Sequence, residues 1–160
     1  MRLLILAVGR FKTAPEQHLA ENYLQRAAKL GRQLGISSIN ISELPESNAA
    51  TAPLRQSEEA GRLLARIPPK AFLISLDERG KELTSVAFAS ELRRIIDRGV
   101  RDLVFLIGGP DGHGQEIARR AGLQLSLGKM TWPHRLMRPM LAEQIYRSVT
   151  ILVNHPYHRA

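Results

Sequence analysis

The sequence predicts an α/β fold with a mainly parallel sheet flanked by helices. Two observations lead to this prediction. Short strand-like runs alternate with longer segments of helical spacing along the chain. The runs at 3–8, 71–76 and 102–107 are almost continuously apolar, which is typical of buried strands. No internal repeat, low-complexity segment or linker interrupts the 160 residues, so we expect a single domain over 1–160.

The N-terminal half begins with an apolar run of six residues, Leu3 to Val8. This run is shorter than the core of a signal peptide or a membrane span, so we interpret it as a strand. Thr13–Glu16 matches a capping box, with Pro15 favouring the first turn of the helix that follows. In order, we expect a strand at 3–8, a helix at 15–34, a strand at 36–44, a loop at 45–53 and a helix at 54–67.

The C-terminal half continues the alternation and ends in a long helix. Leu136, Met140, Leu141, Ile145, Val149 and Leu152 form its apolar face, at three- and four-residue steps. Pro139 fits this helix only within its first turn, where backbone amides lack intrahelical partners. In order, we expect a strand at 71–76, a turn at 77–81, a helix capped by Thr84 or Ser85 and running to about 97, a strand at 102–107, a helix at 115–121, a strand at 123–127 and a helix at 135–152.

Charge and composition narrow the function. The formal net charge is +8, and residues 117–160 hold seven basic residues against one acidic residue, Glu143. A basic surface of this kind suits a polyanion such as nucleic acid, although it also suits a solvated face without a partner. The chain has no cysteine, which excludes disulfides, thiolate metal sites and cysteine nucleophiles. Because no run reaches membrane length, we expect a cytoplasmic protein with no membrane partner.

A glycine-rich loop, Gly108–Gly114, directly follows the strand at 102–107. In open α/β sheets, ligands bind beyond the carboxyl ends of the strands, and glycines let a ligand approach the backbone closely. The loop matches neither the P-loop nor the three-glycine dinucleotide fingerprint. It therefore favours a small nucleoside-like ligand without a polyphosphate, with a simple tight turn as the alternative.

Two further segments carry unusual side chains. Residues 126–134 join the last strand to the last helix and contain the only tryptophan, Trp132, which suits an adenine ring or, alternatively, plugs the core. The tail, Asn154–Arg159, carries two histidines, a tyrosine and an arginine, which suit stacking on a base and binding phosphate; the alternative is a loose chain end. His155 and His158 lack a nearby carboxylate, so we expect no metal site.

Taken together, these segments resemble the RlmH family of bacterial ribosomal RNA methyltransferases, which belongs to the SPOUT class. The resemblance covers the whole chain. Two positions depart from the family pattern: Gly128 stands where a serine is common, and Pro139 stands where an apolar helix former is usual. The resemblance rests on five runs in this order: Ile107–Gly112, Ser126–Leu127, Met130–Arg138, Leu141–Arg147 and Asn154–Arg159.

The resemblance implies a homodimer with a C-terminal trefoil knot that binds S-adenosylmethionine and methylates N3 of a pseudouridine in 23S ribosomal RNA, in the ribosome. It implies that His134, Arg138, Tyr157 and Arg159 face the RNA, and that the catalytic residues are His155, Tyr157 and Arg159. The cofactor residues it implies are Leu76, Gly108, Leu127, Gly128, Lys129, Met130, Thr131 and Trp132.

The residues leave two alternatives open. A tail histidine is a candidate base for the N3 proton, whereas Arg159 or Arg138 would stabilise the N3 anion without a base. The alternative functions are methylation of another RNA by a SPOUT-like enzyme and non-catalytic binding of RNA at the ribosome. A further hypothesis is that, in a dimer, the tail of one subunit completes the site of its partner.

Overall fold

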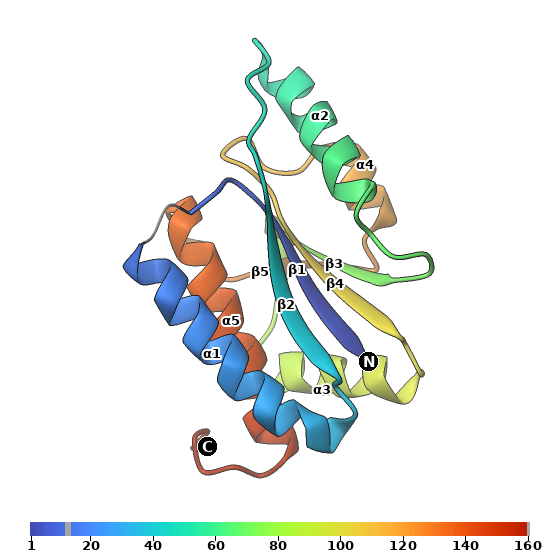
Figure 1. The fold of residues 1–160 in the computed structure, drawn as a ribbon, viewed down its shortest axis with the longest axis vertical. Helices are drawn as coiled ribbons and strands as arrows, with labels where there is room; N and C mark the ends of the chain where they lie inside the picture. Colours follow the sequence, from blue (N-terminus) through green and yellow to red (C-terminus); the bar gives the residue numbers. More distant parts are fainter. Residues whose placement is uncertain (12–13, 160) are drawn as a thin grey trace.

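The computed structural model describes residues 1–11 and 14–159, and within them it contains one five-stranded sheet (Figure 1). The strand order is β2-β1-β4-β3-β5, and all four neighbouring pairs are parallel. This arrangement confirms the predicted α/β class with a parallel sheet. The strands are β1 (Arg2–Val8), β2 (Ser38–Leu44), β3 (Phe72–Glu82), β4 (Asp102–Ile107) and β5 (Leu123–Ser126).

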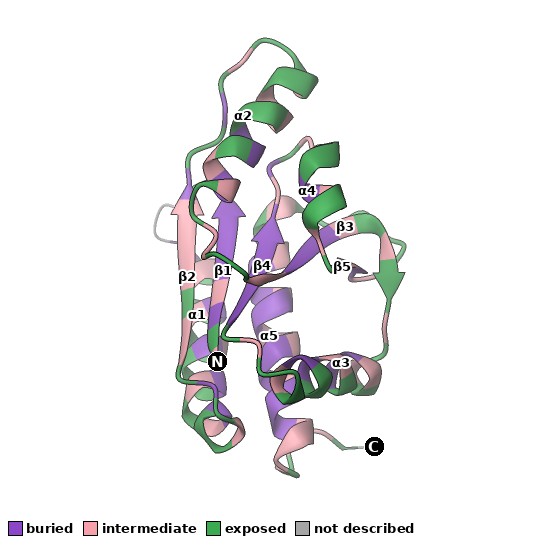
Figure 2. Ribbon diagram, turned by 90° about the vertical axis from the view of Figure 1, so that its right-hand side faces the viewer, coloured by how far each residue is buried: buried purple, intermediate pink, exposed green. Residues whose placement is uncertain are grey.

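Helices cover both faces of the sheet. Alternate side chains of β1 point to opposite faces: Leu3 and Ile5 pack with α1, α3 and α5, while Leu6 and Val8 pack with α2 and α4. Figure 2 shows the central strands β1 and β4 buried between these two layers, whereas the edge strand β2 is mainly half-buried. The helices are α1 (Pro15–Gly31), α2 (Ala52–Leu64), α3 (Ser85–Asp97), α4 (Gln115–Arg120) and α5 (His134–Leu152), with a 3-10 turn at Arg32–Leu34.

Most predicted elements are confirmed to within a few residues, and the Thr84 cap is present, because its side chain accepts a hydrogen bond from the Ala87 amide at 3.1 Å. Pro15 begins α1 as predicted. The N-cap residue of α1 is Ala14, and among the described residues no side chain makes a capping hydrogen bond there. Thr13, the first residue of the expected capping box, lies outside the described residues.

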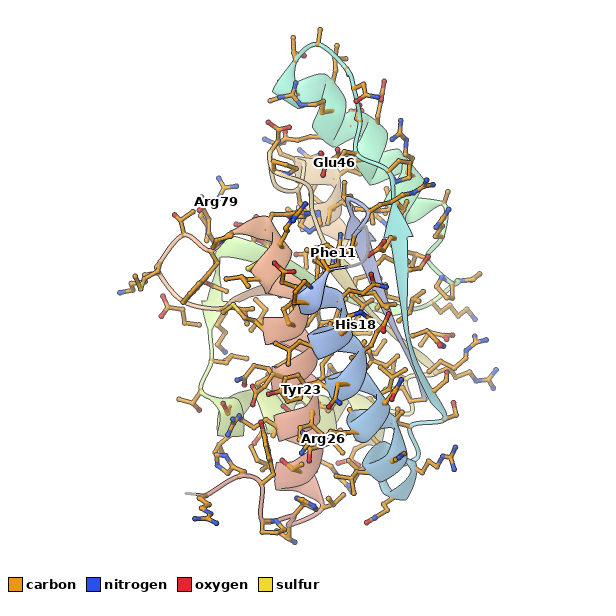
Figure 3. All side chains as sticks on the ribbon, turned by 60° about the vertical axis from the view of Figure 1, so that its left-hand side comes forward. Phe11, His18, Tyr23, Arg26, Glu46 and Arg79 are labelled. Carbon is orange, nitrogen blue, oxygen red and sulfur yellow. The ribbon has the colours of Figure 1, made fainter. Side chains whose placement is uncertain are left out.

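The predicted turn at 77–81 is wrong, because β3 continues through it to Glu82. The pairing of β3 with β5 shifts register between Leu76 and Lys81, so the turn-forming residues build an irregularity within the strand instead of ending it. Gly80 allows this close approach: a Cβ there would lie 2.7 Å from the Gln124 carbonyl carbon. The irregularity projects Arg79 outward beside the carboxyl end of the first part of β3 (Figure 3).

The expected position of Pro139 is also wrong. Because α5 begins at His134, Pro139 is beyond the first turn, and it is buried inside the helix. A proline beyond the first turn of a helix has no N–H to donate, so a carbonyl of the preceding turn lacks its amide partner. The trefoil knot stays a prediction from the resemblance.

Candidate active site

A cleft of about 270 Å³ lies at the carboxyl edge of the sheet. Three segments line it: Leu76–Arg79 of β3, the loop Gly108–His113 after β4, and the connection from β5 to α5. The structure brings seven of the eight predicted cofactor residues into this one cleft; Lys129 is exposed and does not line it. The seven are Leu76, Gly108, Leu127, Gly128, Met130, Thr131 and Trp132.

The chemistry of the cleft combines apolar side chains with exposed backbone. Leu76, Ile107 and Met137 contribute apolar surface, and Gly108 contributes backbone without a side chain. Gly128 has a φ of +120°, a conformation that residues with side chains rarely adopt, and its amide and carbonyl both bond to the Ser126 hydroxyl. The serine and glycine together therefore fix the turn that enters the connection to α5.

His113 closes the inner side of the glycine-rich loop. Its Nε2 lies 3.1 Å from the Leu106 carbonyl oxygen, to which it donates a hydrogen bond. Burial lowers the pKa of His113, against the opposing effects of this hydrogen bond and the negative charge of Asp77. The imidazole is therefore neutral at physiological pH, and it links the loop to the end of β4.

Arg138 does not face solvent, so the RNA contact expected for its side chain is not available in this structure. It is 1% exposed, donates to Glu43 Oε1 at 2.7 Å and to the carbonyl oxygens of Val8 and Gly9, and stacks on the Phe11 ring at 3.9 Å. Burial lowers the pKa of Arg138, but a guanidinium stays charged in proteins. The side chain is a buried cation that joins α5 to the ends of β1 and β2.

His134 shares one of these partners. Its Nε2 lies 2.9 Å from the Val8 carbonyl oxygen, which also accepts from Arg138 Nη2 at 2.9 Å. His134 also lines the cleft, at the first residue of α5. These two contacts anchor the N-terminus of α5, and with it the segment that carries Trp132, beside the end of β1.

The tail is packed against α5 rather than loose. The Tyr157 ring lies 4.6 Å from the Tyr146 ring, centre to centre, and its hydroxyl donates to Glu143 Oε1 at 3.0 Å. Burial raises the pKa of Tyr157, and hydrogen bonds with Tyr23 and Glu143 raise it further. The hydroxyl therefore remains protonated at neutral pH.

Arg26 supports the tail, and sequence reasoning missed it. Its guanidinium carbon lies 4.2 Å from the Tyr146 ring centre and 5.4 Å from that of Tyr157, and Nη2 donates to the Tyr146 hydroxyl at 2.8 Å. Figure 3 shows Arg26 and Tyr23 on α1, next to α5. No local pattern indicates this role, because the contact spans 120 residues of sequence.

The tail and the cleft lie at opposite ends of α5. The helix has 19 residues, which at a rise of ~1.5 Å per residue gives a length of roughly 28 Å. In Figures 1 and 2 the C-terminus is at the bottom, whereas β1, β2 and β4 run from the bottom of the molecule toward the top. A single chain therefore does not bring His155, Tyr157 and Arg159 to the predicted cofactor residues.

An apolar groove of about 620 Å³ runs along the side of α5 and includes part of the connection from β5. Leu19 is 50% exposed, Trp132 38% and Leu136 37%, and Met140 also lines the groove. Leu136 and Met140 belong to the predicted apolar face of α5, but only the deeper part of that face, including Leu141 and Ile145, is buried. Part of this helix therefore presents apolar surface outside the core.

The basic residues of the C-terminal segment divide into two groups. Arg138 and Arg147 form ion pairs with Glu43 and Glu143. Within 14–159, the others are exposed and have no carboxylate within 4.0 Å, so they are available to an external anion; these are Arg119, Arg120, Lys129, Arg135 and Arg159.

Arg79 adds a basic group at the mouth of the cleft, and sequence reasoning missed it as well. Its side chain is 81% exposed and lies 3.4 Å from Asp77. The sequence predicts a turn at 77–81, and a turn does not indicate where Arg79 lies. The irregular pairing of β3 with β5 places Arg79 beside the cleft.

Comparison with known proteins decides the family. Residues 1–158 match a family model described as a predicted SPOUT methyltransferase. The chain belongs to the SPOUT methyltransferase family. Two relatives named ribosomal RNA large subunit methyltransferase H, from Rhodopseudomonas palustris (strain ATCC BAA-98 / CGA009) and Brucella anthropi, are 52% and 50% identical to it over 160 residues, covering 100% of both chains in each case.

A more distant similarity is to the SpoU methyltransferase AviRb from Streptomyces viridochromogenes, solved in complex with AdoMet. It has 12% identity and a TM-score of 0.40, and it covers 96% of this chain and 61% of that one. In the ranges that the structure describes for this SPOUT family member, no helix is long and apolar enough to cross a membrane, and no group of three histidines or carboxylates is arranged to hold a metal ion.

We predict that Arg138→Ala destabilises the protein by about 3 kcal/mol, because it leaves Glu43 and two carbonyls without their buried partner. Arg135→Ala, at an exposed neighbouring position, is the control and should change the free energy of unfolding by less than about 0.5 kcal/mol. Urea denaturation measures both. Equal, small effects would contradict the structural role of Arg138.

The lowered pKa of His113 predicts that the free energy of unfolding depends on pH. Above pH 6.5 the imidazole is neutral in both states and contributes nothing; below 6.5 the unfolded chain binds a proton that the folded chain resists, so stability falls. His113→Gln should remove this component, which is at most about 1.4 kcal/mol per pH unit. Urea denaturation at pH 7.5 and 5.5 tests it, with His18→Gln on α1 as the exposed control; identical slopes for both variants would contradict the assignment.

Proposed function

We propose that the protein transfers a methyl group from S-adenosylmethionine to N3 of a pseudouridine in large-subunit ribosomal RNA, acting as a homodimer. The observation that carries the proposal is the convergence of the two glycine-bearing segments, Gly108–His113 and Leu127–Trp132, on one cleft of a SPOUT family member. The relatives at 52% and 50% identity bear the name of a ribosomal RNA large subunit methyltransferase. Such a substrate implies a cytoplasmic enzyme.

The residues of the cleft fit this cofactor. Leu76, Ile107 and Met137 offer apolar surface for an adenine ring, the backbone around Gly108 can read its edge, and Asp77 can accept from hydroxyl or amino groups. The cleft has no lysine-bearing phosphate loop, which suits a nucleoside without a polyphosphate. When bound, S-adenosylmethionine supplies a methyl group on a positively charged sulfur.

The basic surface supports an RNA substrate. Arg79 stands at the mouth of the cleft, Lys129 and Arg135 are exposed on the segment that borders it, and Arg119 and Arg120 are exposed on α4. Arginine and lysine contacts to phosphate give binding that is independent of sequence and sensitive to salt. Arg79, Lys129 and Arg135 are therefore the basic residues nearest to the entrance that the target base must use, whereas Arg119 and Arg120 offer charge elsewhere on the surface.

The apolar groove supports a homodimer. Leu19 of α1, Leu136 and Met140 of α5, and Trp132 just before α5 present apolar side chains to the groove, and a second copy of this chain is the occupant we propose. The groove shares Leu127, Gly128 and Trp132 with the cleft. A partner seated there would therefore border the cofactor site directly.

Within this dimer, we propose that the tail of one copy meets the cleft of the other. The length of α5 separates the two features within one chain, whereas an antiparallel partner helix would carry its own C-terminus toward the cleft. Arg26, Tyr146 and Glu143 hold Tyr157 in a defined position before any partner or substrate arrives. His134 would face the same base from within the chain that supplies the cleft.

For the proton of N3, the contacts favour loss of the proton to solvent water, with Arg159 stabilising the resulting anion, over removal by a dedicated protein base. The Tyr157 hydroxyl donates a hydrogen bond to Glu143, and the raised pKa of Tyr157 keeps the hydroxyl protonated. His155 Nδ1 accepts from the Tyr157 amide at 3.2 Å, so a neutral ring carries its own proton on Nε2. Arg159 is exposed and has a permanent charge to place beside N3.

Labelled S-adenosylmethionine and ribosomes from a bacterial strain lacking the relevant modification test the proposed activity. We expect label at N3 of a pseudouridine in the large-subunit RNA, located by nuclease digestion and mass spectrometry. Label in another RNA would contradict the assignment of large-subunit ribosomal RNA as the substrate. Calorimetry that shows no binding of S-adenosylmethionine would favour an RNA-binding protein without catalysis.

Subunit mixing tests the shared site. Deletion of residues 154–160 should abolish transfer but leave cofactor binding intact. Gly108→Val should displace the loop that lines the cleft and so prevent cofactor binding, because a Cβ there meets the Gly112 backbone at 3.0 Å. Co-expression of the two inactive chains should restore about a quarter of the wild-type rate, since half of the dimers are mixed and each has one complete site. A mixture as inactive as its parents would contradict the exchange of tails.

A further inference from the structure

Helix α2 contacts the glycine-rich loop of the cleft through two successive side chains. Arg55 forms a two-pronged ion pair with Asp111, in which Nε donates to Oδ2 at 2.6 Å and Nη2 donates to Oδ1 at 2.9 Å. Gln56 Nε2 donates to the Asp111 carbonyl oxygen at 2.7 Å. Side chain and backbone of the same loop residue are thus both held from one helix.

A third side chain of α2, one turn further on, closes against the same loop. Glu59 is 4% exposed, and its Oε1 accepts from the Ser47 amide at 2.9 Å. Its other oxygen, Oε2, is buried without a hydrogen-bond partner and lies against Gly109, where a Cβ would be only 2.8 Å away. Only a glycine allows the loop to approach the helix this closely.

The opposite side of the loop faces the cleft. Gly108, Gly109, Asp111 and Gly112 all line it, and within the loop the Gly112 amide donates to the Gly109 carbonyl oxygen at 2.9 Å. Glycines give such a loop many accessible conformations, and fixing one of them costs conformational entropy. The contacts from α2 restrict the loop in advance, because a forked arginine–carboxylate pair fixes orientation as well as distance.

We infer that Arg55 and Gln56 are positioning residues that hold the loop Gly108–Gly112 in the shape that accepts the cofactor. The inference rests on the proposed function for the identity of that cofactor. Arg55 also lowers the pKa of Asp111 through their hydrogen bonds, so the carboxylate stays ionised and the pair persists across the physiological range. Arg55 Nη1 extends the contact to the Ala49 carbonyl oxygen at 3.0 Å, in the segment that precedes α2.

The test compares Arg55→Ala with Arg62→Ala. Arg62 lies on the same helix and pairs with Glu58 at 3.3 Å, but it bonds to the carbonyls of Pro45 and Glu46 and not to the loop. In Arg55→Ala without cofactor, hydrogen–deuterium exchange of the amides of Gly109 and of 111–113 should accelerate. The Kd and KM for S-adenosylmethionine should rise about tenfold, with kcat at saturating cofactor and Tm close to wild type. Arg62→Ala should match wild type in loop exchange, Kd, KM, kcat and Tm.

Two more variants keep the inference falsifiable if Arg55→Ala folds poorly. Arg55→Lys retains the charge but loses the fork, and Asp111→Asn retains the shape but loses the charge, so each should weaken cofactor binding by several-fold. Unchanged exchange in the loop and unchanged affinity in all three variants would overturn the inference. The exchange measurement needs no cofactor, so it separates failure of this inference from failure of the proposed function.

Discussion

The buried cation of Arg138 is the interaction on which the site depends. A charge removed from water is costly unless it is paired and hydrogen-bonded, and here Glu43 and the carbonyls of Val8 and Gly9 compensate the two terminal nitrogens of the guanidinium, although its Nε is buried without a partner among the described residues. The same contacts join three elements that are far apart in sequence: the ends of β1 and β2 and the first turns of α5. His134 adds a bond to the same carbonyl, so the segment before α5 is fixed beside the sheet edge, where it forms one wall of the cleft.

Sequence patterns predicted the elements well where one physical signal dominates. The almost continuous apolar run at 102–107 predicted the limits of β4, and apolar spacing placed α5 to within one residue of its start. The patterns failed where tertiary contacts override local preference. The turn-forming residues after Leu76 continue β3 as an irregular strand, because pairing with β5 resumes at Lys81. Pro139 lies inside α5, because the helix begins at His134. The helix preference of proline alone would place Pro139 in the first turn.

The candidate site was predictable in chemistry but not in arrangement. Glycine-bearing segments after strands indicated the cleft, and the structure brings most of those residues together. The position of Arg138 was not accessible to such reasoning, because an arginine is usually exposed and its burial depends on Glu43, 95 residues away. Arg26 and Arg55 were missed for the same reason, since each acts on a segment distant in sequence. The sequence of the tail indicated side chains suited to RNA. It did not indicate that the length of α5 separates them from the cleft of their own chain.

A crystal structure with S-adenosylmethionine bound tests the central claim most directly, namely that the cleft takes the cofactor and a second copy completes it. We predict a dimer packed through the groove of Leu19, Leu136 and Met140, with the cofactor between Leu76, Gly108 and Trp132 and Arg159 of the other copy at the mouth of that cleft. Cofactor density elsewhere, or a tail that reaches only its own chain, would contradict it.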